Sequence, residues 1–251
     1  MDVGRDVPGA QTELFDARSS ARAKYARLVV GRPGLGALIQ HECVVLVAQS
    51  IPGALGLVLR KTLYPLLLGA CGRNVVFGQN VVLRHPHKIR IADNVVIDDN
   101  CLLDAKGESN AGIAIGRGVF VGRNTILSCN NGDITIADNA NLGFNCEVFS
   151  GSSVSIGAGT LLAAYAYIVG GDHDLSDPTI PILEQRRVSA GVQVGSGVWI
   201  GAGVRVLDGV AIGDGAVIGA NAVVREPVPA GAIAAGVPAR VISMRDGRAP
   251  R

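Results

Sequence analysis

The chain has 251 residues, of which 48% are hydrophobic, 4% are aromatic and 34 are glycine. Its 23 lysines and arginines against 21 acidic residues give a formal charge of +2. This composition supports a large aliphatic core and excludes the aromatic-rich core of an ordinary mixed domain. It also excludes a dense basic field that neutralises phosphates, so we expect no nucleic-acid partner.

The cysteines and the first residues of the sequence indicate a compartment. There are five cysteines, and none forms a C-x-x-C pair, which predicts free thiols in a reducing environment. The opening MDVGRDVPGAQTELFD is acidic and polar where a signal peptide requires a basic and then an apolar run. We therefore expect a cytoplasmic protein.

Residues 1–72 are expected to form an N-terminal helical segment. The longest apolar run, residues 43–59, is interrupted by Gln49, Ser50 and Pro52 and is shorter than the roughly 20 residues of a membrane span. An apolar stripe at helical spacing follows, with Arg60 and Lys61 outside it: Leu55, Val58, Leu59, Leu63 and Leu66. We expect a helical cap packed on the main domain. Peripheral membrane contact stays open, since cations cluster nearby at Arg18, Arg22, Lys24, Arg27 and Arg32.

From residue 77 an aliphatic residue returns every six positions. One phase holds over Val188, Val194, Ile200, Val206, Ile212, Ile218 and Val224. Earlier phases cover Phe77 and Leu83; Ile91, Ile97 and Leu103; Ile115, Val121 and Leu127; Ile136, Leu142 and Val148; Ile156, Leu162 and Ile168. The position four residues after these anchors is again small or β-branched, as in Val95, Thr125 and Ala216. Each hexad therefore has two inward positions.

Turn residues between the anchors keep every strand short. Segments such as Ala-Asp-Asn and Gly-Asp-Gly demand a turn in each hexad, so the chain is expected to wind as a three-sided coil with one hexad per side. Pairs of aliphatic residues two positions apart (doublets) mark successive turns of the coil (rungs), which are expected about 4.8 Å apart. These doublets are Ile89 and Ile91, Ile113 and Ile115, Ile134 and Ile136, Val154 and Ile156, Val192 and Val194, and Val210 and Ile212. The fold class is all-β, with the anchors stacked as an internal aliphatic column.

This pattern resembles the hexapeptide-repeat acyltransferase family over about residues 73–243, which leaves residues 244–251 as a tail. The resemblance implies a left-handed parallel β-helix, a handedness that the general preference for right-handed crossovers does not predict. It also implies a homotrimer with substrate clefts between neighbouring prisms.

The largest break in the repeat lies between Ile168 and Val188, which are 20 positions apart where one hexad requires six. This inserted loop, residues 169–187, reads VGGDHDLSDPTIPILEQRR and contains His173. Loops on rigid scaffolds commonly carry function, and a histidine can act as a general base at neutral pH. By residue chemistry alone, a solvated histidine among turn-forming aspartates is an equally good interpretation.

A closer resemblance gives the loop a role. The strings GGDHDLSDPTIPI and GSGVWIGAGVRVLDGVAIGDGAVIGANAVV are similar to the maltose, galactoside and xenobiotic O-acetyltransferase branch. By this resemblance His173 is the base that deprotonates the acceptor hydroxyl. The string GFNCEVFSGSSVSIG resembles the branch's asparagine-bearing rung, so Asn145 would orient the acceptor and the tetrahedral intermediate. The alternative for Asn145 is a turn former inside its hexad.

The same resemblance implies an acetyl-CoA site with no metal. Trp199 would line the cleft beside the donor arm, although packing in the trimer is the alternative. The backbone N–H of Ala202 would hold the thioester carbonyl, and Ala220 on the next rung would leave room for the pantetheine arm. Arg240 in AGVPARVI matches an arginine near the adenine. Glu226 stands where the branch commonly has a phosphate-facing lysine, so either Arg225 substitutes or the contact shifts to Arg240 and Arg245.

We therefore expect an O-acetyltransferase that moves an acetyl group from acetyl-CoA to a hydroxyl of a saccharide or related acceptor by direct attack. Cys101 and Cys146 occupy inward positions, so we predict no thiol nucleophile. N-acetylation of an amino sugar and a non-catalytic scaffold stay open as alternatives. A three-histidine zinc site is implausible, because His173 lies about four rungs from His85 and His87, which are expected at an exposed corner where weak metal binding stays open.

Overall fold

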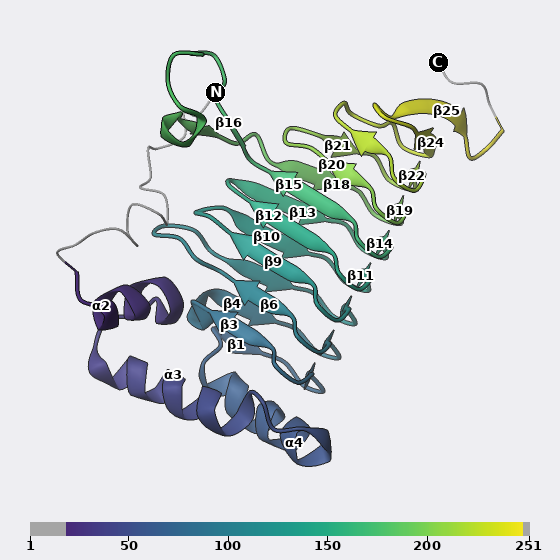
Figure 1. The fold of residues 1–251 in the computed structure, drawn as a ribbon. Helices are drawn as coiled ribbons and strands as arrows, with labels where there is room; N and C mark the ends of the chain where they lie inside the picture. The colour runs from purple at the N-terminus through teal and green to yellow at the C-terminus, as the bar shows by residue number, and fades with distance from the viewer. Residues whose placement is uncertain (1–18, 248–251) are drawn as a thin grey trace.

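The structure, a computed structural model, describes residues 19–247. Arg18, the rest of the opening segment and residues 248–251 of the tail lie outside the described residues. The chain begins with short helices and continues as a parallel β-helix (Figure 1). The expected all-β coil with an N-terminal helical segment is therefore confirmed. The helices are α2 (Ala21–Tyr25), the π-helix η1 (Ala26–Val30), α3 (Leu35–Ala48), α4 (Gly53–Leu63) and the 3-10 helix η2 (Tyr64–Leu66).

The coil has three sheets, which we name A, B and C in the order the chain visits them. Sheet A contains β1 (Ala70–Cys71), β4 (Ile89–Ile91), β7 (Ile113–Ile115), β10 (Asp133–Ile136), β13 (Ser153–Ile156), β18 (Val192–Val194) and β21 (Ala211–Ile212). Sheet B contains β2 (Val76–Phe77), β5 (Val96–Ile97), β8 (Phe120–Val121), β11 (Asn141–Leu142), β14 (Leu161–Leu162), β19 (Trp199–Ile200), β22 (Val217–Ile218), β24 (Ala232–Ala235) and β25 (Arg240–Met244). Sheet C contains β3 (Val82–Arg84), β6 (Leu102–Asp104), β9 (Ile126–Cys129), β12 (Glu147–Ser150), β15 (Tyr167–Gly170), β20 (Arg205–Val206) and β23 (Val223–Val224).

The strand register follows the hexads. Ile91 aligns with Ile115, which aligns with Ile136, and the predicted doublets fall on successive strands of sheet A. All predicted anchors from Phe77 to Val224 are buried except Val188, which is 40% exposed. The prediction for Val188 is wrong, because this residue pairs antiparallel with Asp172 outside the coil. The small positions four residues after the anchors are buried as expected.

Two edges of the coil matter for function. The B–C edge consists of the turns that lead from sheet B to sheet C, and the C–A edge consists of those that lead from sheet C to sheet A. Asparagines take the left-handed backbone in many turns, and their amides form ladders, as where Asn124 Nδ2 donates to Asn145 Oδ1 at 3.0 Å. Asparagine tolerates this conformation better than most residues, which explains its recurrence at the turns.

The N-terminal helices cover one end of the column, with a buried face that differs from the predicted one. Leu59 and Leu63 pack partly against the core, but Leu55 is 65% exposed and Val58 and Leu66 are also exposed. Arg60, predicted to lie off the packed stripe, is buried instead. Its guanidinium donates to the carbonyl of Phe77 in the first turn of the coil and to three carbonyls at the end of α3 and after it, those of Ala48, Gln49 and Ile51. None of the helices within residues 19–247 is sufficiently long and apolar to cross a bilayer.

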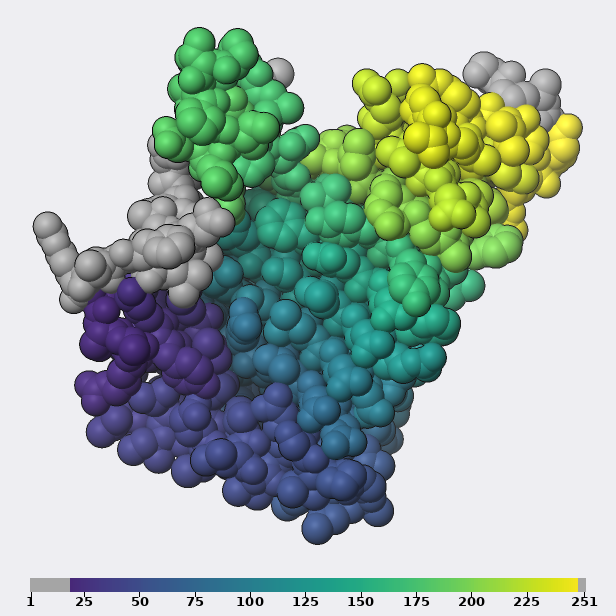
Figure 2. Space-filling view, in the orientation of Figure 1, coloured from purple at the N-terminus to yellow at the C-terminus, as the bar shows by residue number. Residues whose placement is uncertain are grey.

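Helix η1 also folds back over the lowest turn of the C–A edge. His85 is only 6% exposed, and its Nε2 lies 2.8 Å from the carbonyl oxygen of Arg27. The predicted exposed corner at His85, Pro86 and His87 is therefore wrong, since η1 covers it. Figure 2 shows the helical segment at the lower end and along one side, with the inserted loop standing above it on the same side.

Candidate active site

The inserted loop leaves the coil at the C–A edge as a short hairpin. β16 (Asp172–His173) pairs antiparallel with β17 (Arg187–Val188), and η4 (Ile182–Glu184) forms part of the far end. Carboxylates stabilise the loop from within: Asp174 accepts from the N–H of Ser176, and Asp177 accepts from the N–H and hydroxyl of Thr179. These hydrogen bonds lower the pKa of both carboxyls. The aspartates thus have the turn-forming role that was one of the two interpretations.

The inserted loop exposes several apolar side chains. Four large hydrophobic side chains are exposed there, those of Leu175, Ile180, Ile182 and Leu183. Apolar side chains gathered on a projecting loop are typical of a surface that contacts another protein.

His173 lies at the base of this hairpin and is half-buried. Its Nδ1 is buried and meets no hydrogen-bond partner among the described residues. Its backbone N–H donates to Asp172, but no hydrogen bond between an aspartate of the loop and the imidazole is found within residues 19–247. The ring is therefore not committed to a structural contact within the part of the chain that the structure describes.

Trp199, Ala202 and Ala220 lie at the other edge of sheet C. Trp199 is exposed on the outer face of sheet B, beside Leu161 and Val217 on the neighbouring strands. Ala202 and Ala220 occupy consecutive turns of the B–C edge, where the N–H of Asn221 donates to the carbonyl of Ala202 at 2.8 Å. The three residues thus lie on neighbouring rungs, Trp199 on sheet B just before the turn of Ala202 and Ala220 on the next turn.

The backbone around Ala202 leaves a donor available. The N–H groups of Gly201 and Gly203 donate to carbonyls of adjacent turns, whereas the N–H of exposed Ala202 has no backbone acceptor within residues 19–247. A backbone N–H in a tight turn without an acceptor of its own can bind a developing oxyanion.

The arginines of the predicted coenzyme site are separated. Arg240 begins β25 beside the turn of Ala220, and its Nη1 lies 3.5 Å from Glu226 Oε2. Arg225 follows β23 at the far end of sheet C and is exposed. Arg245 donates to the carbonyl of Gly215. The carboxylate of Glu226 therefore competes with a coenzyme phosphate for the charge of Arg240.

Asn145 also lies on the B–C edge, two turns of the coil below Ala202. It adopts φ 55°, and its side-chain oxygen accepts from Asn124. The turn-forming role is evident in this contact.

A single chain does not bring His173 to the B–C edge. The chain runs from the B–C edge to His173 through β15 and its flanking residues. At roughly 3.3 Å per residue, the width of sheet C separates His173 from the B–C edge by about 20 Å. No side chain crosses this distance. An active site that contains both His173 and Ala202 therefore requires two copies of the chain.

The sequence reasoning missed an aromatic cluster on the B–C edge. Tyr165 and Phe144 meet edge to face with ring centroids 6.4 Å apart, and the guanidinium of Arg123 lies 4.6 Å from the Phe144 centroid. Tyr165 is 59% exposed and has φ 63°, a conformation that is strained for a bulky residue. The signal was present in the sequence: Tyr165 occupies the turn position that holds Asn124 and Asn145 in earlier coils.

The buried cysteines are poor nucleophiles. Burial raises the pKa of the Cys101 and Cys129 thiols to about 12 and also raises that of Cys146. These thiols stay protonated at neutral pH, inside the column or at its wall. In the described part of the chain, no group of three or more metal-binding side chains could hold a metal ion.

Comparison with known proteins agrees with the repeat. A family model described as bacterial transferase hexapeptide (six repeats) matches residues 191–226, and one described as hexapeptide repeat of succinyl-transferase matches residues 133–168. A Mycobacterium tuberculosis protein named "Probable acetyltransferase Rv3034c" is 36% identical over 135 residues. That match covers 54% of this chain and 45% of the relative, so this chain matches less than half of the relative's length.

Solved structures extend the similarity to most of the coil. A variant of AntD, an N-acyltransferase from Bacillus cereus in complex with dTDP and coenzyme A, aligns with a TM-score of 0.51 and 26% identity, over 71% of this chain and 85% of that one. AntD in complex with dTDP and 3-hydroxybutyryl-CoA aligns with a TM-score of 0.55 and 23% identity, over 78% and 90%, a similarity of fold. With both repeat models matched and the hexad column buried, the chain contains hexapeptide repeats similar to those of bacterial transferases.

Proposed function

We propose that the protein transfers an acetyl group from acetyl-CoA to a hydroxyl of a saccharide acceptor. The observation that carries this proposal is the single long excursion from the coil, which presents His173 with an uncommitted ring at an edge of an otherwise filled prism. The acetyltransferase name of the mycobacterial relative and the coenzyme A bound to AntD support acyl transfer from a coenzyme A thioester.

In this mechanism His173 takes the proton from the acceptor hydroxyl as its oxygen attacks the thioester carbonyl. The N–H of Ala202 donates to the oxygen of the tetrahedral intermediate, a kind of contact commonly worth about 3 kcal/mol. The C–S bond then breaks, and the imidazolium returns the proton to the departing coenzyme A thiolate. Asn145 would orient the acceptor, and Trp199 and Ala220 would flank the pantetheine arm, with Arg240 or Arg225 at its phosphates.

The catalytic unit in this proposal is a homotrimer. The separation of His173 from Ala202 within one chain and the exposed apolar side chains of the loop both favour a site at the seam between copies. The loop of one copy would pack beside the B–C edge of the next, where Tyr165 and Phe144 offer an exposed aromatic surface.

Transfer to an amine is the second candidate, since AntD is an N-acyltransferase. A matched acceptor pair separates the two: methyl glucoside, which offers only hydroxyls, and glucosamine, which adds an amine. Thiol release from acetyl-CoA and the mass of the acceptor are measured together. We expect acetylation at oxygen of both acceptors. Modification of the amine alone would replace the first candidate with the second, and a lack of thiol release across a wider saccharide panel would favour the scaffold.

Peripheral membrane contact is a further part of the proposal, supported by the outer faces of α3 and α4. Large apolar side chains are exposed on both helices: Leu35, Ile39, Leu46 and Val47 on α3, and Leu55, Leu57 and Val58 on α4. The segment also carries the cations Arg22, Lys24 and Arg32. An apolar helical face with nearby cations is typical of binding at an anionic lipid surface.

Replacing Leu46 and Leu55 together by serine should weaken binding to vesicles of phosphatidylcholine and phosphatidylglycerol by about tenfold or more, because burying each leucine contributes roughly 1.5–3 kcal/mol. Cosedimentation measures this, with Thr62→Ser on α4 as the matched control. Equal binding of the double variant and the wild type would contradict a role for this face.

A further inference from the structure

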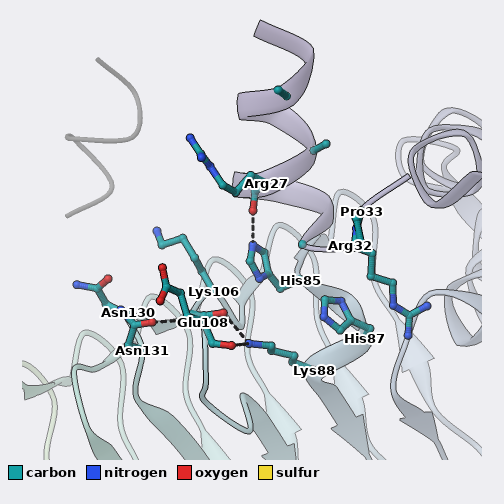
Figure 3. A pocket seen from close by; sticks show the side chains of 14 residues that line it. Arg27, Arg32, Pro33, His85, His87, Lys88, Lys106, Glu108, Asn130 and Asn131 are labelled. Atoms are coloured by element: carbon teal, nitrogen blue, oxygen red, sulfur yellow. Dashed lines mark hydrogen bonds between the residues drawn. The ribbon is translucent and has the colours of Figure 1, made fainter. Parts of the chain in front are cut away.

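A pocket of about 660 Å³ lies where the N-terminal segment meets the C–A edge. Arg27 and Arg32 come from η1 and the residues after it, and the opposite wall consists of turns of the coil near residues 85–88, 106–108 and 130–131. Figure 3 shows the Arg27 and Lys106 side chains extending to the same side of His85, toward Asn130, with Arg32 beyond His87. The pocket leaves no local signature in the sequence, since its walls come from segments that are distant in the chain.

The pocket is electropositive. Four cationic side chains line it, those of Arg27, Arg32, Lys88 and Lys106, against the carboxylate of Glu108 in the lining and that of Asp104 behind it, whose Oδ2 lies 3.9 Å from Lys106 Nζ. Lys88 is held within the wall, where its Nζ lies 2.6 Å from the carbonyl of Gly107 and 2.8 Å from Asn110 Oδ1. Burial first, and then the charge of Arg32, lower the pKa of His87 to about 4. The local potential therefore favours an anionic ligand.

The pocket also presents buried hydrogen-bonding atoms without partners. His85 Nε2 donates to the carbonyl of Arg27, which leaves Nδ1 as an acceptor in the neutral ring. This Nδ1, like that of His87, is buried and has no hydrogen-bond partner among residues 19–247. A buried acceptor without a partner is costly, and a ligand hydroxyl would satisfy it. Gly31 closes over the ring, where a Cβ would come within 2.5 Å of His85.

The position of the pocket connects it with His173. Both lie on the C–A edge, and the turn of Asn131 is two rungs below the inserted loop, with only the turn of Ser152 between them. At about 4.8 Å per rung the separation along this edge is about 10 Å from Asn131, about 14 Å from Lys106 and about 19 Å from His85, so an acceptor that spans it is longer than a single sugar. The predicted coenzyme residues Ala202 and Ala220 lie on the other edge of sheet C.

We infer that this pocket binds the phosphate-bearing end of the acceptor, so that the acceptor is a phosphorylated saccharide whose free hydroxyl extends along the C–A edge toward His173. Arg32 holds the phosphate beyond His87, the acceptor nitrogens of His85 and His87 receive sugar hydroxyls, and Lys106 contacts the acceptor on the side toward Asn130. This inference rests on the proposed function, and it narrows the acceptor from saccharides in general to those that carry a phosphate.

Calorimetric titration of the whole protein with glucose 1-phosphate, without acetyl-CoA, tests the pocket apart from catalysis. The neutral sugar glucose and inorganic phosphate serve as comparison ligands. We expect glucose 1-phosphate to bind at least tenfold tighter than either, because only this probe offers both an anion and hydroxyls. Arg32→Gln and Lys106→Gln should each weaken it by about 10- to 100-fold, the usual effect of losing a charge-assisted hydrogen bond. Lys61→Gln on α4 is the matched control and should bind as the wild type does.

Three results would overturn the inference: no binding of glucose 1-phosphate, equal affinity in the wild type and both pocket variants, or displacement of the probe by coenzyme A, which would assign the pocket to the donor. None of these depends on turnover. An inactive protein that still binds glucose 1-phosphate would therefore count against the proposed function and not against the pocket.

Discussion

Replacing His173 by alanine should lower kcat/KM for acyl transfer by about 10²- to 10⁴-fold, the usual contribution of a general base. The imidazole lies at the base of the inserted loop and can accept the acceptor's proton, and its Nδ1 has no structural partner within residues 19–247. The folded state should be unaffected, since the side chain is half-buried on a projecting hairpin and such substitutions commonly change stability by about 0.5 kcal/mol or less. Steady-state kinetics and thermal unfolding on the same preparation measure both quantities.

The matched control is Ser176→Ala in the same loop. This change removes the hydroxyl beside Asp174 but leaves the imidazole and the hairpin pairing intact. It should keep activity within a factor of about two. If His173→Ala also stays within a factor of about two of the wild type, the imidazole is not the base and the mechanism is wrong.

The coil itself was predictable because its cause is local and periodic. A buried anchor every sixth residue and a turn in each hexad determine both the sheet assignment and the register, so that Ile91, Ile115 and Ile136 could be aligned before any coordinates. The prediction that Val188 is buried is wrong because it relied on this periodicity alone. Val188 keeps the phase of Val194, but the hairpin with Asp172 takes it out of the column, and phase alone does not distinguish a strand in the coil from one in a loop.

The N-terminal segment was less predictable, because backbone groups outside α4 decide which helical face is buried. The carbonyl of Phe77 in the coil and those of Ala48 and Ile51 at the end of α3 and after it need donors, and Arg60 supplies them from a face that helical periodicity assigned to solvent. The burial of His85 likewise depends on η1 folding back across 58 positions of sequence. Neither contact leaves a pattern in the local sequence.

For the candidate site, the sequence indicated the residues but not their arrangement. The length of the excursion singled out His173, and the last coils singled out Trp199, Ala202 and Ala220. Only the structure reveals that the two groups lie on opposite edges of sheet C. In the proposed trimer, the loop of another copy would face the B–C edge. A contact there would explain why Tyr165 is held in a strained turn and why its ring and that of Phe144 are exposed.

The central claim is that the active site is shared between copies of the chain, and assemblies that mix two variants test this claim directly. His173→Ala removes the base but leaves the B–C edge intact, and Ala202→Trp fills the donor groove but leaves His173 intact. Ala202 is exposed at its turn, so the bulky side chain should project outward without disturbing the column. Each variant alone should be nearly inactive.

The two variants, carrying different affinity tags, are co-expressed, and assemblies that contain both are isolated by successive capture on each tag. In a mixed trimer one seam of the three joins an intact His173 to an intact Ala202 edge, so activity should return to about a third of the wild-type value. Mixed assemblies as inactive as either parent would mean that each chain builds its site alone, which contradicts the account.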